Sequence, residues 1–443
     1  MSSFSVVQIV VLFSVVAGMS ASDHGPIFHT QYGDVRGVYI EEGAFVLGLP
    51  FGQPPVGELR WKPPKPFTGS WAPHIRDGSV PGPACPQIGC GPDDEDPQFV
   101  CPRDGKLSED CLYLNIFISR TILTNSTVRL PVLVWFHGGG YDSGTGSALS
   151  YDGRFLANKT NTVVMTTNYR LGALGFLVAG EGEDAPTGNY GTMDQIQALK
   201  WVQENIGDFG GDKDHVTIFG QSAGSDSVGI HMTYNGSADL FEKGIMSSVP
   251  FTIYHKSRAD AVRLGNRFAE LLNCSAGDVK YYRPVLSVAV TDWVWACPTR
   301  NVIRNAIAGG NSDVWLYVFD HVFSIKHTWG NSTCCFTHVC HASDIPIVFQ
   351  SAPLANLSLT ADEQVLADTI AYHYGNFAHT GDPNKPNEHL PRPNLNIPDN
   401  LNWPKYNKDN GFPILNMTTP QNILMHDYRK DKCDFWDRED IYT

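Results

Sequence analysis

The sequence has few charged residues and no cluster of basic ones. Charged side chains make up 18% of the 443 residues, and 46 Asp and Glu against 32 Lys and Arg give a formal net charge of −14. A protein with this acidic balance and no run of Lys or Arg repels the phosphates of nucleic acids and anionic lipids. We therefore exclude nucleic acid and an anionic membrane surface as the main partner. The apolar content of 42% is that of a globular chain and not of a disordered one.

Long apolar runs are equally scarce. Beyond the N-terminus, no stretch approaches the roughly 20 apolar residues that a membrane-spanning helix needs. The apolar run at residues 6–17 is shorter, and the residues at 18–22 are mostly small, as at a signal-peptide cleavage site. We therefore predict a signal peptide at residues 1–22. Since no Lys or Arg precedes the apolar run, the alternative is a buried N-terminal strand.

Metal-binding spacings are also missing. No C-x-x-C pair lies near a histidine cluster at the spacing of a zinc site, so we expect disulfides at the cysteines, no metal and no cofactor. The ten cysteines are at positions 85, 90, 101, 111, 274, 297, 334, 335, 340 and 433. Seven N-x-S/T glycosylation sequons begin at Asn125, Asn158, Asn235, Asn273, Asn331, Asn356 and Asn416. Together with the signal-like leader, these features predict a secreted, extracellular glycoprotein.

No internal repeat or low-complexity linker divides the chain, and strand and helix patterns alternate along it. Short apolar runs at 131–136, 162–167 and 216–219 are typical of strands buried on both faces, and residues 193–205 have the apolar spacing of a helix. Further strands are expected at 244–249 and 314–319, and further helices at 259–272 and 362–374. The alternation predicts an α/β fold with a mostly parallel central sheet and helices on both faces. We expect a single domain over residues 23–443.

A G-x-S-x-G motif, Gly220-Gln221-Ser222-Ala223-Gly224, stands between an expected strand and an expected helix. This strand–turn–helix setting is the one that a nucleophile elbow requires. Small residues flank the serine because its backbone is forced into a strained conformation. In a chain with 42 glycines the motif alone would be a weak signal, but its setting predicts Ser222 as a nucleophile.

A glycine-rich segment, His137-Gly138-Gly139-Gly140, follows the apolar run at 131–136. Acyl transfer needs backbone N–H donors aimed at the developing oxyanion, and glycine lets the chain approach closely enough. No G-K-[ST] follows, which argues against a phosphate loop. A flexible glycine loop is the remaining alternative.

A nucleophilic serine also needs a base, and the sequence has fifteen histidines. Most of them are expected to be surface or packing residues. His341 stands in a segment crowded with cysteines, as a pinned catalytic loop would. We take His341 as the candidate base, with an ordinary packing role as the alternative.

Several motifs together resemble the type-B carboxylesterase family, which includes cholinesterases and the non-enzymatic neuroligins. They are PPVGELRWKPP within 51–64, EDCLYLN at 109–115, GNYGTMD at 188–194, FGGD at 209–212, FGQSAG at 219–224 and CDFWD at 433–437. The resemblance implies an α/β-hydrolase fold and a serine carboxylesterase that acts on small-molecule esters. It implies Ser222 as the nucleophile and His341 as the general base, within a motif similar to H-x-x-E/D-I/L-P. Gly139, Gly140 and Ala223 would supply the N–H groups of the oxyanion hole.

The resemblance also implies two disulfides. Cys85–Cys111 corresponds to the first disulfide of the family, and Cys90–Cys101 would nest inside it. Each closes a short loop and is worth roughly 2–4 kcal/mol through restriction of the unfolded state. The remaining pairings stay open, with Cys297 and the cluster at 334–340 as one possibility.

The chain departs from the family pattern at the acid of the triad. In the family, a strand that ends in G-T-x-x-x-E-G presents this acid before an Asp-x-x-x-x-x-Pro-Thr-Arg motif. Here the motif stands at residues 292–300, and no such strand pattern lies between it and the helix expected at 259–272. We infer that the segment with the acid, its strand and the flanking helices is absent, so the triad acid is unidentified. A missing interior strand leaves its neighbours without ladder partners unless they pair with each other.

Three carboxylates near these motifs have open roles. Asp320, after the run at 314–319, and Asp344, three residues after His341, are conceivable substitutes for the acid. The alternative for Asp320 is a solvated carboxylate at a strand end, and the alternative for Asp344 is an ordinary residue of the histidine loop. Asp226, just after the elbow, either contacts the triad or is a tolerated helix residue. Loss of the acid's role can lower turnover by about 10⁴.

Two functions therefore remain. The first is a secreted serine carboxylesterase that works through an acyl-enzyme on Ser222, and it is favoured by Ser222, His341 and the glycine loop together. The second is a catalytically impaired or inactive family member that acts as an extracellular binding or adhesion protein, and the missing acid favours it. No membrane-spanning segment is expected in the chain, and the sequence does not indicate its oligomeric state.

Overall fold

A computed structural model of the protein describes residues 25–87, 90, 101–102, 105–177, 188–251, 290–329, 333–386 and 402–438. The predicted signal peptide, the helix expected at 259–272, Cys274 and the sequons at Asn273 and Asn331 lie outside these residues. No helix within them is both long enough and apolar enough to cross a bilayer.

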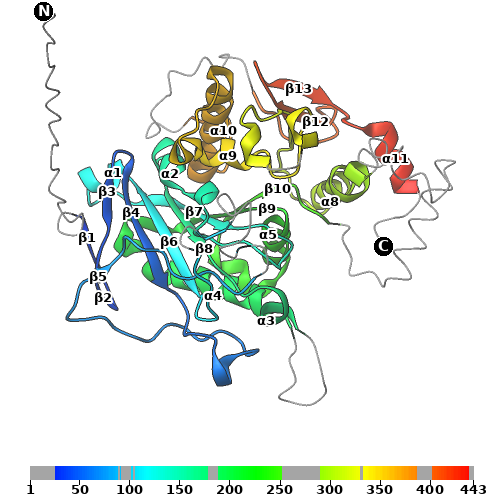
Figure 1. Ribbon diagram of the computed structural model, residues 1–443. Coiled ribbons are helices and arrows are strands. Elements are labelled where there is room, and N and C mark those ends of the chain that lie inside the picture. Colours follow the sequence, from blue (N-terminus) through cyan, green and yellow to red (C-terminus); the bar gives the residue numbers. More distant parts are fainter. Residues whose placement is uncertain are drawn as a thin grey trace, which may run out of the picture.

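A seven-stranded sheet forms the centre of the protein (Figure 1). Its strands, in spatial order, are β10 (Lys243–Ser247), β9 (Gly211–Gln221), β7 (Leu130–Phe136), β8 (Val163–Thr167), β6 (Tyr113–Ser119), β4 (Gly43–Pro50) and β3 (Val38–Ile40). The four strands from β10 to β8 pair in parallel, and the pairs from β8 to β3 are antiparallel. The predicted α/β fold with a mostly parallel central part is confirmed.

The middle of the sheet is buried on both faces because its strands are apolar throughout. All seven residues of β7 are buried. Val132 and Val134 pack in one core cluster, and Leu133 and Trp135 pack in the other, since successive side chains of a strand point to opposite faces. Full burial of such a side chain contributes about 1.5–3 kcal/mol.

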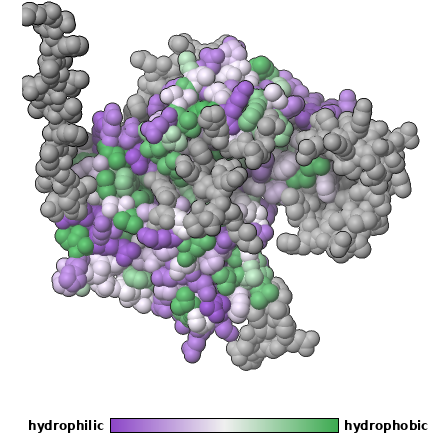
Figure 2. Space-filling model, in the orientation of Figure 1, coloured by the Kyte–Doolittle hydropathy of each residue, from purple (hydrophilic) through white to green (hydrophobic). Residues whose placement is uncertain are grey.

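Helices cover both faces of the sheet (Figure 1). The described helices are α1 (Arg120–Thr124), α2 (Arg154–Thr160), α3 (Gly172–Phe176), α4 (Tyr190–Asn205), α5 (Ala223–Thr233), α8 (Cys297–Ala308), α9 (Ile345–Phe349), α10 (Ala361–Thr380) and α11 (Lys430–Arg438). Of these, α8 and α11 lie to one side of the sheet and pack on each other. Leu199 of α4 belongs to the core on one face, and Leu366 of α10 to the core on the other. Figure 2 shows hydrophobic residues scattered among hydrophilic ones on the described part of one face, as is normal for a protein surface.

Helix α10 is longer than the helix predicted at 362–374 and begins at a capping box. The Thr360 side chain accepts from the Glu363 N–H, and the Glu363 carboxylate accepts from the Thr360 N–H. Burial alone would raise the pKa of Glu363, but hydrogen bonds from His321, Ser324 and Thr360 lower it to about 2. The ionised carboxylate therefore ties the start of α10 to the segment around His321.

Among the described strands, the central sheet ends at β10. Strands β11 (Tyr317–Phe319), β12 (Pro413–Met417) and β13 (Ile423–His426) form a sheet of their own. Among the described strands, β10 pairs with β9 and β11 pairs with β12, so β10 and β11 do not close up into one ladder. A hydrogen bond of 2.5 Å between the Ser247 and Tyr317 hydroxyls connects them. The expected loss of ladder partners is thus what the described strands show.

Two further small structures complete the fold. Strands β1 (Ile27–Thr30), β2 (Gly33–Arg36) and β5 (Arg76–Asp77) form a separate sheet near the N-terminus. At the other end, α11 is fixed to α8 by the Cys297–Cys433 disulfide and by Arg300, which donates to Asp434 at 3.0 Å. Cys297 therefore does not join the cysteines at 334–340, one of the pairings that the sequence left open.

Candidate active site

Ser222 occupies a strained turn at the carboxyl end of β9. Its backbone has φ +56° and ψ −125°, directly between the last residue of β9 and the first of α5. A positive φ is uncommon outside glycine and persists only where the surroundings enforce it. The Ser222 N–H donates to the Ser247 carbonyl at 3.0 Å, so β10 holds the turn in place. The hydroxyl-bearing side chain is half-buried.

The glycines of the G-x-S-x-G motif are required by close backbone contacts. A Cβ atom on Gly224 would lie 1.9 Å from the Phe136 carbonyl oxygen, and one on Gly220 would lie 2.4 Å from the Gly224 carbonyl carbon. Both contacts are with backbone, which cannot move aside as a side chain can. The elbow therefore packs directly against the end of β7.

The glycine segment 137–140 follows β7 and lies against the elbow. A Cβ atom on Gly138 would be 3.1 Å from the Cβ of Ser222. Gly139 and Gly140 have φ of +110° and +62°, and no described residue accepts a hydrogen bond from their N–H groups. The N–H of Ala223 is the first of α5, at the positive end of that helix. Free N–H donors beside a half-buried serine are what an oxyanion needs.

Buried aromatic and amide groups hold the glycine segment. The His137 Nδ1–H donates to the Gly138 carbonyl at 2.8 Å, and the ring stacks on Tyr169 with centroids 4.4 Å apart. Full burial lowers the pKa of His137 to about 4, so the ring is neutral and serves packing. The Gln87 side chain accepts a hydrogen bond from the Gly144 N–H at 2.7 Å and donates one to the Gly144 carbonyl at 2.9 Å.

Asp226 has a partner that the sequence did not indicate. The Tyr141 hydroxyl, next to Gly140 in the chain, donates to Asp226 Oδ2 at 2.9 Å and accepts from Ser227 Oγ at 3.3 Å. Burial and the nearby Asp226 carboxylate raise the pKa of Tyr141. Helix α5 thereby holds the glycine segment through a tyrosine. No local motif could have revealed this contact, because 85 residues separate the two partners.

The structure brings His341 to the elbow, where its neighbour is Gln221. The Gln221 Nε2 atom lies 3.0 Å from His341 Nε2 and 3.5 Å from Nδ1. The imidazole also packs on Trp295, with ring centroids 5.2 Å apart. His341 is exposed, but desolvation by the surrounding protein lowers its pKa. The hydrogen-bond neighbour of the ring among the described residues is thus Gln221 and not the Ser222 hydroxyl, although a neutral imidazole has the protonation state that a base needs.

Neither of the conceivable substitute acids accompanies this histidine. Among the described residues, no Asp or Glu oxygen lies within 4.0 Å of a His341 ring nitrogen. Asp320 is exposed and accepts from Asn416 Nδ2 at 3.5 Å. Asp344 is buried at the start of α9, where burial raises its pKa to about 6 and Ser247 is its hydrogen-bonding neighbour. The position of Asp320 fits a solvated strand-end carboxylate, and the position of Asp344 fits an ordinary residue of the histidine loop.

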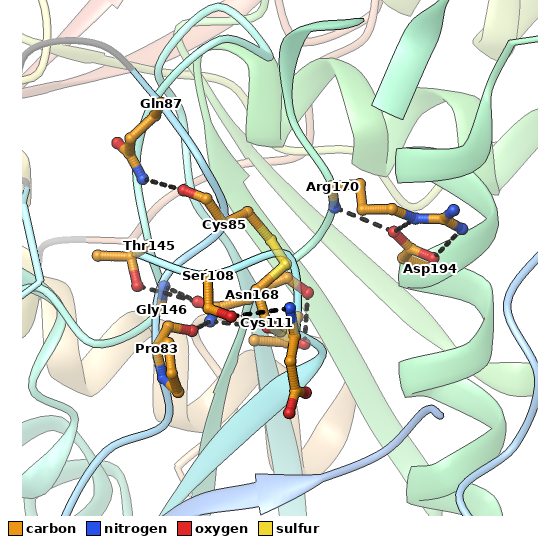
Figure 3. Close-up of a disulfide and its surroundings, with 12 residues drawn as sticks. Pro83, Cys85, Gln87, Ser108, Cys111, Thr145, Gly146, Asn168, Arg170 and Asp194 are labelled. Carbon is orange, nitrogen blue, oxygen red and sulfur yellow. Dashed lines mark hydrogen bonds and ion pairs between the residues drawn. A yellow bond between two sulfur atoms is a disulfide. The ribbon is translucent and has the colours of Figure 1, made fainter. Parts of the chain in front are cut away.

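Disulfides fix the surroundings of the site. The structure contains Cys85–Cys111 and Cys90–Cys101, the two pairings that the resemblance implies, together with Cys297–Cys433 and Cys335–Cys340. Figure 3 shows Cys85–Cys111 beside Asn168, which donates to the carbonyls of Pro83 and Cys111 and accepts from Thr145 and Gly146. Asn168 thus connects the backbone at Cys111 to Thr145 and Gly146, which follow the glycine segment in the chain.

The comparisons with known proteins point to one family. The model of the carboxylesterase family matches residues 24–285 and 276–436. "Crystal protein" of Dictyostelium discoideum is 29% identical over 482 residues, which covers 82% of this chain and 83% of that protein. "Fumonisin B1 esterase" of Sphingopyxis macrogoltabida is 41% identical over 57% of this chain and 45% of its own length. "Liver carboxylesterase 1" of Oryctolagus cuniculus is 38% identical over 56% and 44%, respectively.

The two kinds of match differ in extent. The alignments at about 40% identity span less than half of the esterases that they match. The alignment with the Dictyostelium protein runs over 482 positions, more than the 443 residues of this chain, although it includes only 82% of them. That relative therefore has residues within the aligned span for which this chain has no counterpart.

Proposed function

Because the chain belongs to the carboxylesterase family and has its α/β-hydrolase fold, we propose that it is a secreted, glycosylated serine carboxylesterase with Ser222 as its nucleophile. The observation that carries this proposal is the strained Ser222 at the β9–α5 turn, packed against a glycine segment in which the Gly139 and Gly140 N–H groups donate to no described residue. The names of two of the matched relatives, the fumonisin B1 esterase and the liver carboxylesterase, also state hydrolysis of esters.

In the proposed reaction, five residues have a role. Ser222 Oγ attacks the ester carbonyl while His341 accepts its proton, and the tetrahedral oxyanion receives hydrogen bonds from the N–H groups of Gly139, Gly140 and Ala223. His341 then gives the proton to the departing alcohol. Water, activated by the same imidazole, releases the acid from the acyl-enzyme.

His341 performs these steps without a carboxylate beside it among the described residues. A triad acid holds the tautomer of the base and stabilises the imidazolium, and loss of this role can lower turnover by about 10⁴. Here Gln221 and Trp295 hold the ring, but a neutral amide and an indole stabilise the cation less. We therefore propose slow turnover, with the contact to Gln221 giving way when His341 turns toward Ser222.

A second candidate function rests on the described end of the central sheet, where β10 and β11 belong to separate sheets. The described ends of β10 and β11 carry no acid-bearing strand between them, and the nearest hydrogen-bond partner of the base is an amide. These observations favour the alternative in which the chain has lost turnover and acts as an extracellular binding or adhesion protein.

Fluorophosphonate labelling separates the two functions, because the probe reacts only with an activated serine. We expect the wild-type protein to be labelled at Ser222, as located by mass spectrometry of the labelled peptide. Ser222→Ala should abolish the labelling. Ser225→Ala is the matched control, since the Ser225 hydroxyl only donates to the Ser222 carbonyl at 2.8 Å, and it should retain the labelling. Folded wild-type protein that remains unlabelled would support the binding protein instead.

Gln221→Glu tests the contact of the base through its pKa. The substitution places a carboxylate at the position of an amide that lies 3.0 Å from His341 Nε2. An adjacent negative charge favours the imidazolium, so we expect the pKa of His341 to rise by about one unit or more. Because the base must be neutral to accept the serine proton, the rising limb of the pH–rate profile should move to higher pH.

NMR titration of the histidine ring signals measures this shift directly. Gln221→Met has a similar length and no charge, and it should leave the pKa of His341 below its ordinary value. An unchanged pKa in Gln221→Glu would show that the two side chains are not in contact in solution.

A further inference from the structure

The segment that precedes the candidate base contains three cysteines in mutual contact. The sulfur atoms of Cys334, Cys335 and Cys340 all lie within 4.8 Å of one another. Cys335 and Cys340 form a disulfide, and the Cys334 Sγ is 3.9 Å from the Cys335 Sγ. Cys334 is the described cysteine that has no disulfide partner. A free thiol therefore lies directly against a disulfide.

This disulfide differs from the others in its access to solvent. The three other disulfides have both cysteines buried, with at most 4% of any residue exposed. Cys334, in contrast, is exposed, and Cys340 is only half-buried. The imidazole of His338 contacts the Cys334 carbonyl through Nδ1 at 3.3 Å, so it lies at the same exposed turn. Reactive cysteines are those that solvent and small molecules can reach.

We propose that Cys334, Cys335 and Cys340 form a thiol–disulfide exchange site for low-molecular-weight thiols of the glutathione class. The thiolate of the small molecule attacks Cys340 Sγ, a mixed disulfide forms there, and Cys335 leaves as a thiolate that takes up a proton. The Cys334 thiolate then attacks the same Cys340 sulfur, closes a Cys334–Cys340 disulfide and releases the small thiol. One disulfide is present before and after, so no external oxidant or reductant is consumed.

The exchange acts on the residue next to the candidate base. Cys340 immediately precedes His341, and Ala342 after it has a positive φ of +72°. When the disulfide of Cys340 passes from Cys335 to Cys334, the residue to which Cys340 is covalently tied changes by one position. The position of the His341 ring, which depends on contacts with Gln221 and Trp295, changes with that bond partner. This consequence for ester chemistry rests on the proposed function, whereas the exchange itself does not.

Differential alkylation of the folded protein in a glutathione buffer tests the proposal. In wild-type protein, iodoacetamide should label Cys334 before exposure to glutathione, and both Cys334 and Cys335 after it, as resolved by peptide fragmentation. The cysteines of the three buried disulfides should stay unlabelled under the same conditions. In Cys334→Ser the resolving thiol is missing, so the glutathione adduct on Cys340 should accumulate about tenfold or more above the wild-type level.

Three results would overturn the exchange site. They are a disulfide between Cys334 and Cys274 in the wild-type peptide map, a label that stays confined to Cys334, and equal adduct levels in wild type and Cys334→Ser. If Cys334→Ser does not fold, folded wild-type protein can be alkylated at Cys334 instead. Alkylation blocks the same thiol, so this protein should accumulate the same glutathione adduct on Cys340. The rate of fluorophosphonate labelling at Ser222 before and after exchange reports the effect on His341. A protein that is never labelled refutes the esterase proposal and leaves the thiol mapping valid.

Discussion

Replacement of Gly224 by alanine is expected to lower the free energy of unfolding by about 3 kcal/mol or more and to disable the elbow. The added Cβ would lie 1.9 Å from the Phe136 oxygen, 2.7 Å from the Phe136 carbonyl carbon and 2.9 Å from the His137 carbonyl carbon. All three atoms belong to the backbone where β7 passes into the glycine segment. Helix α5 must therefore move away from β7 and take Ser222 out of its position beside Gly138.

Urea unfolding followed by circular dichroism measures this effect, and labelling of Ser222 reports the site. Gly229→Ala is the matched control, because Gly229 lies in the same helix and its added Cβ would meet only side-chain atoms, the Phe251 ring at 3.3 Å and the Met246 sulfur at 3.7 Å. Alanine is the better helix former, so this variant should change stability by no more than about 1 kcal/mol. Equal stability of the two variants would mean that α5 does not pack against β7 as described.

Loss of the charge on Asp194 is expected to destabilise the protein by about 3–5 kcal/mol. Asp194 in α4 accepts from Arg170 N, Nε and Nη2 at distances from 2.7 to 3.0 Å (Figure 3). The Asp194 side chain is 0% exposed and the Arg170 side chain 2%. Asp194→Asn keeps the shape of the side chain but leaves the guanidinium buried and uncompensated. Since Arg170 follows Tyr169, which stacks on His137, the damage should extend to the glycine segment.

The exposed pair Lys213–Asp214 provides the comparison for this ion pair. Asp214 is 74% exposed and lies 3.1 Å from Lys213 Nζ, and a pair of this kind is worth about 0–1 kcal/mol. Asp214→Asn should therefore leave the urea midpoint nearly unchanged, while Asp194→Asn should lower it clearly. If Asp194→Asn lowers the free energy of unfolding by less than about 1 kcal/mol, another group compensates the Arg170 charge.

Much of the site could be predicted because its signals are local. The strand before the elbow, Ser222 and the small residues around it are adjacent in the chain, and the same is true of the apolar run before Gly138. Such segments carry their own periodicity and turn chemistry, whatever the rest of the chain does. The absence of the acid-bearing strand stays a prediction from the sequence, because most of the segment between β10 and the motif at 292–300 lies outside the described residues.

Contacts between distant segments could not be predicted in this way. The pairing of Gln221 with His341 joins residues 120 positions apart, and the bond from Tyr141 to Asp226 spans 85. Asp226 could be read from the sequence either as a contact of the triad or as an ordinary helix residue, and only the approach of the glycine segment to α5 decides its partner. The choice of Cys433 as the partner of Cys297 depends in the same way on how α11 packs against α8.

The sequence by itself thus determined the α/β alternation, the elbow and the glycine segment, because backbone propensity and the apolar period act over a few residues. Only the tertiary structure decided that β10 and β11 stay in separate sheets, that an amide stands beside His341, and that a free thiol lies against the Cys335–Cys340 disulfide. The physical reason is that a hydrogen bond or a disulfide forms between whichever groups the packing brings within reach. That proximity is a property of the whole folded chain.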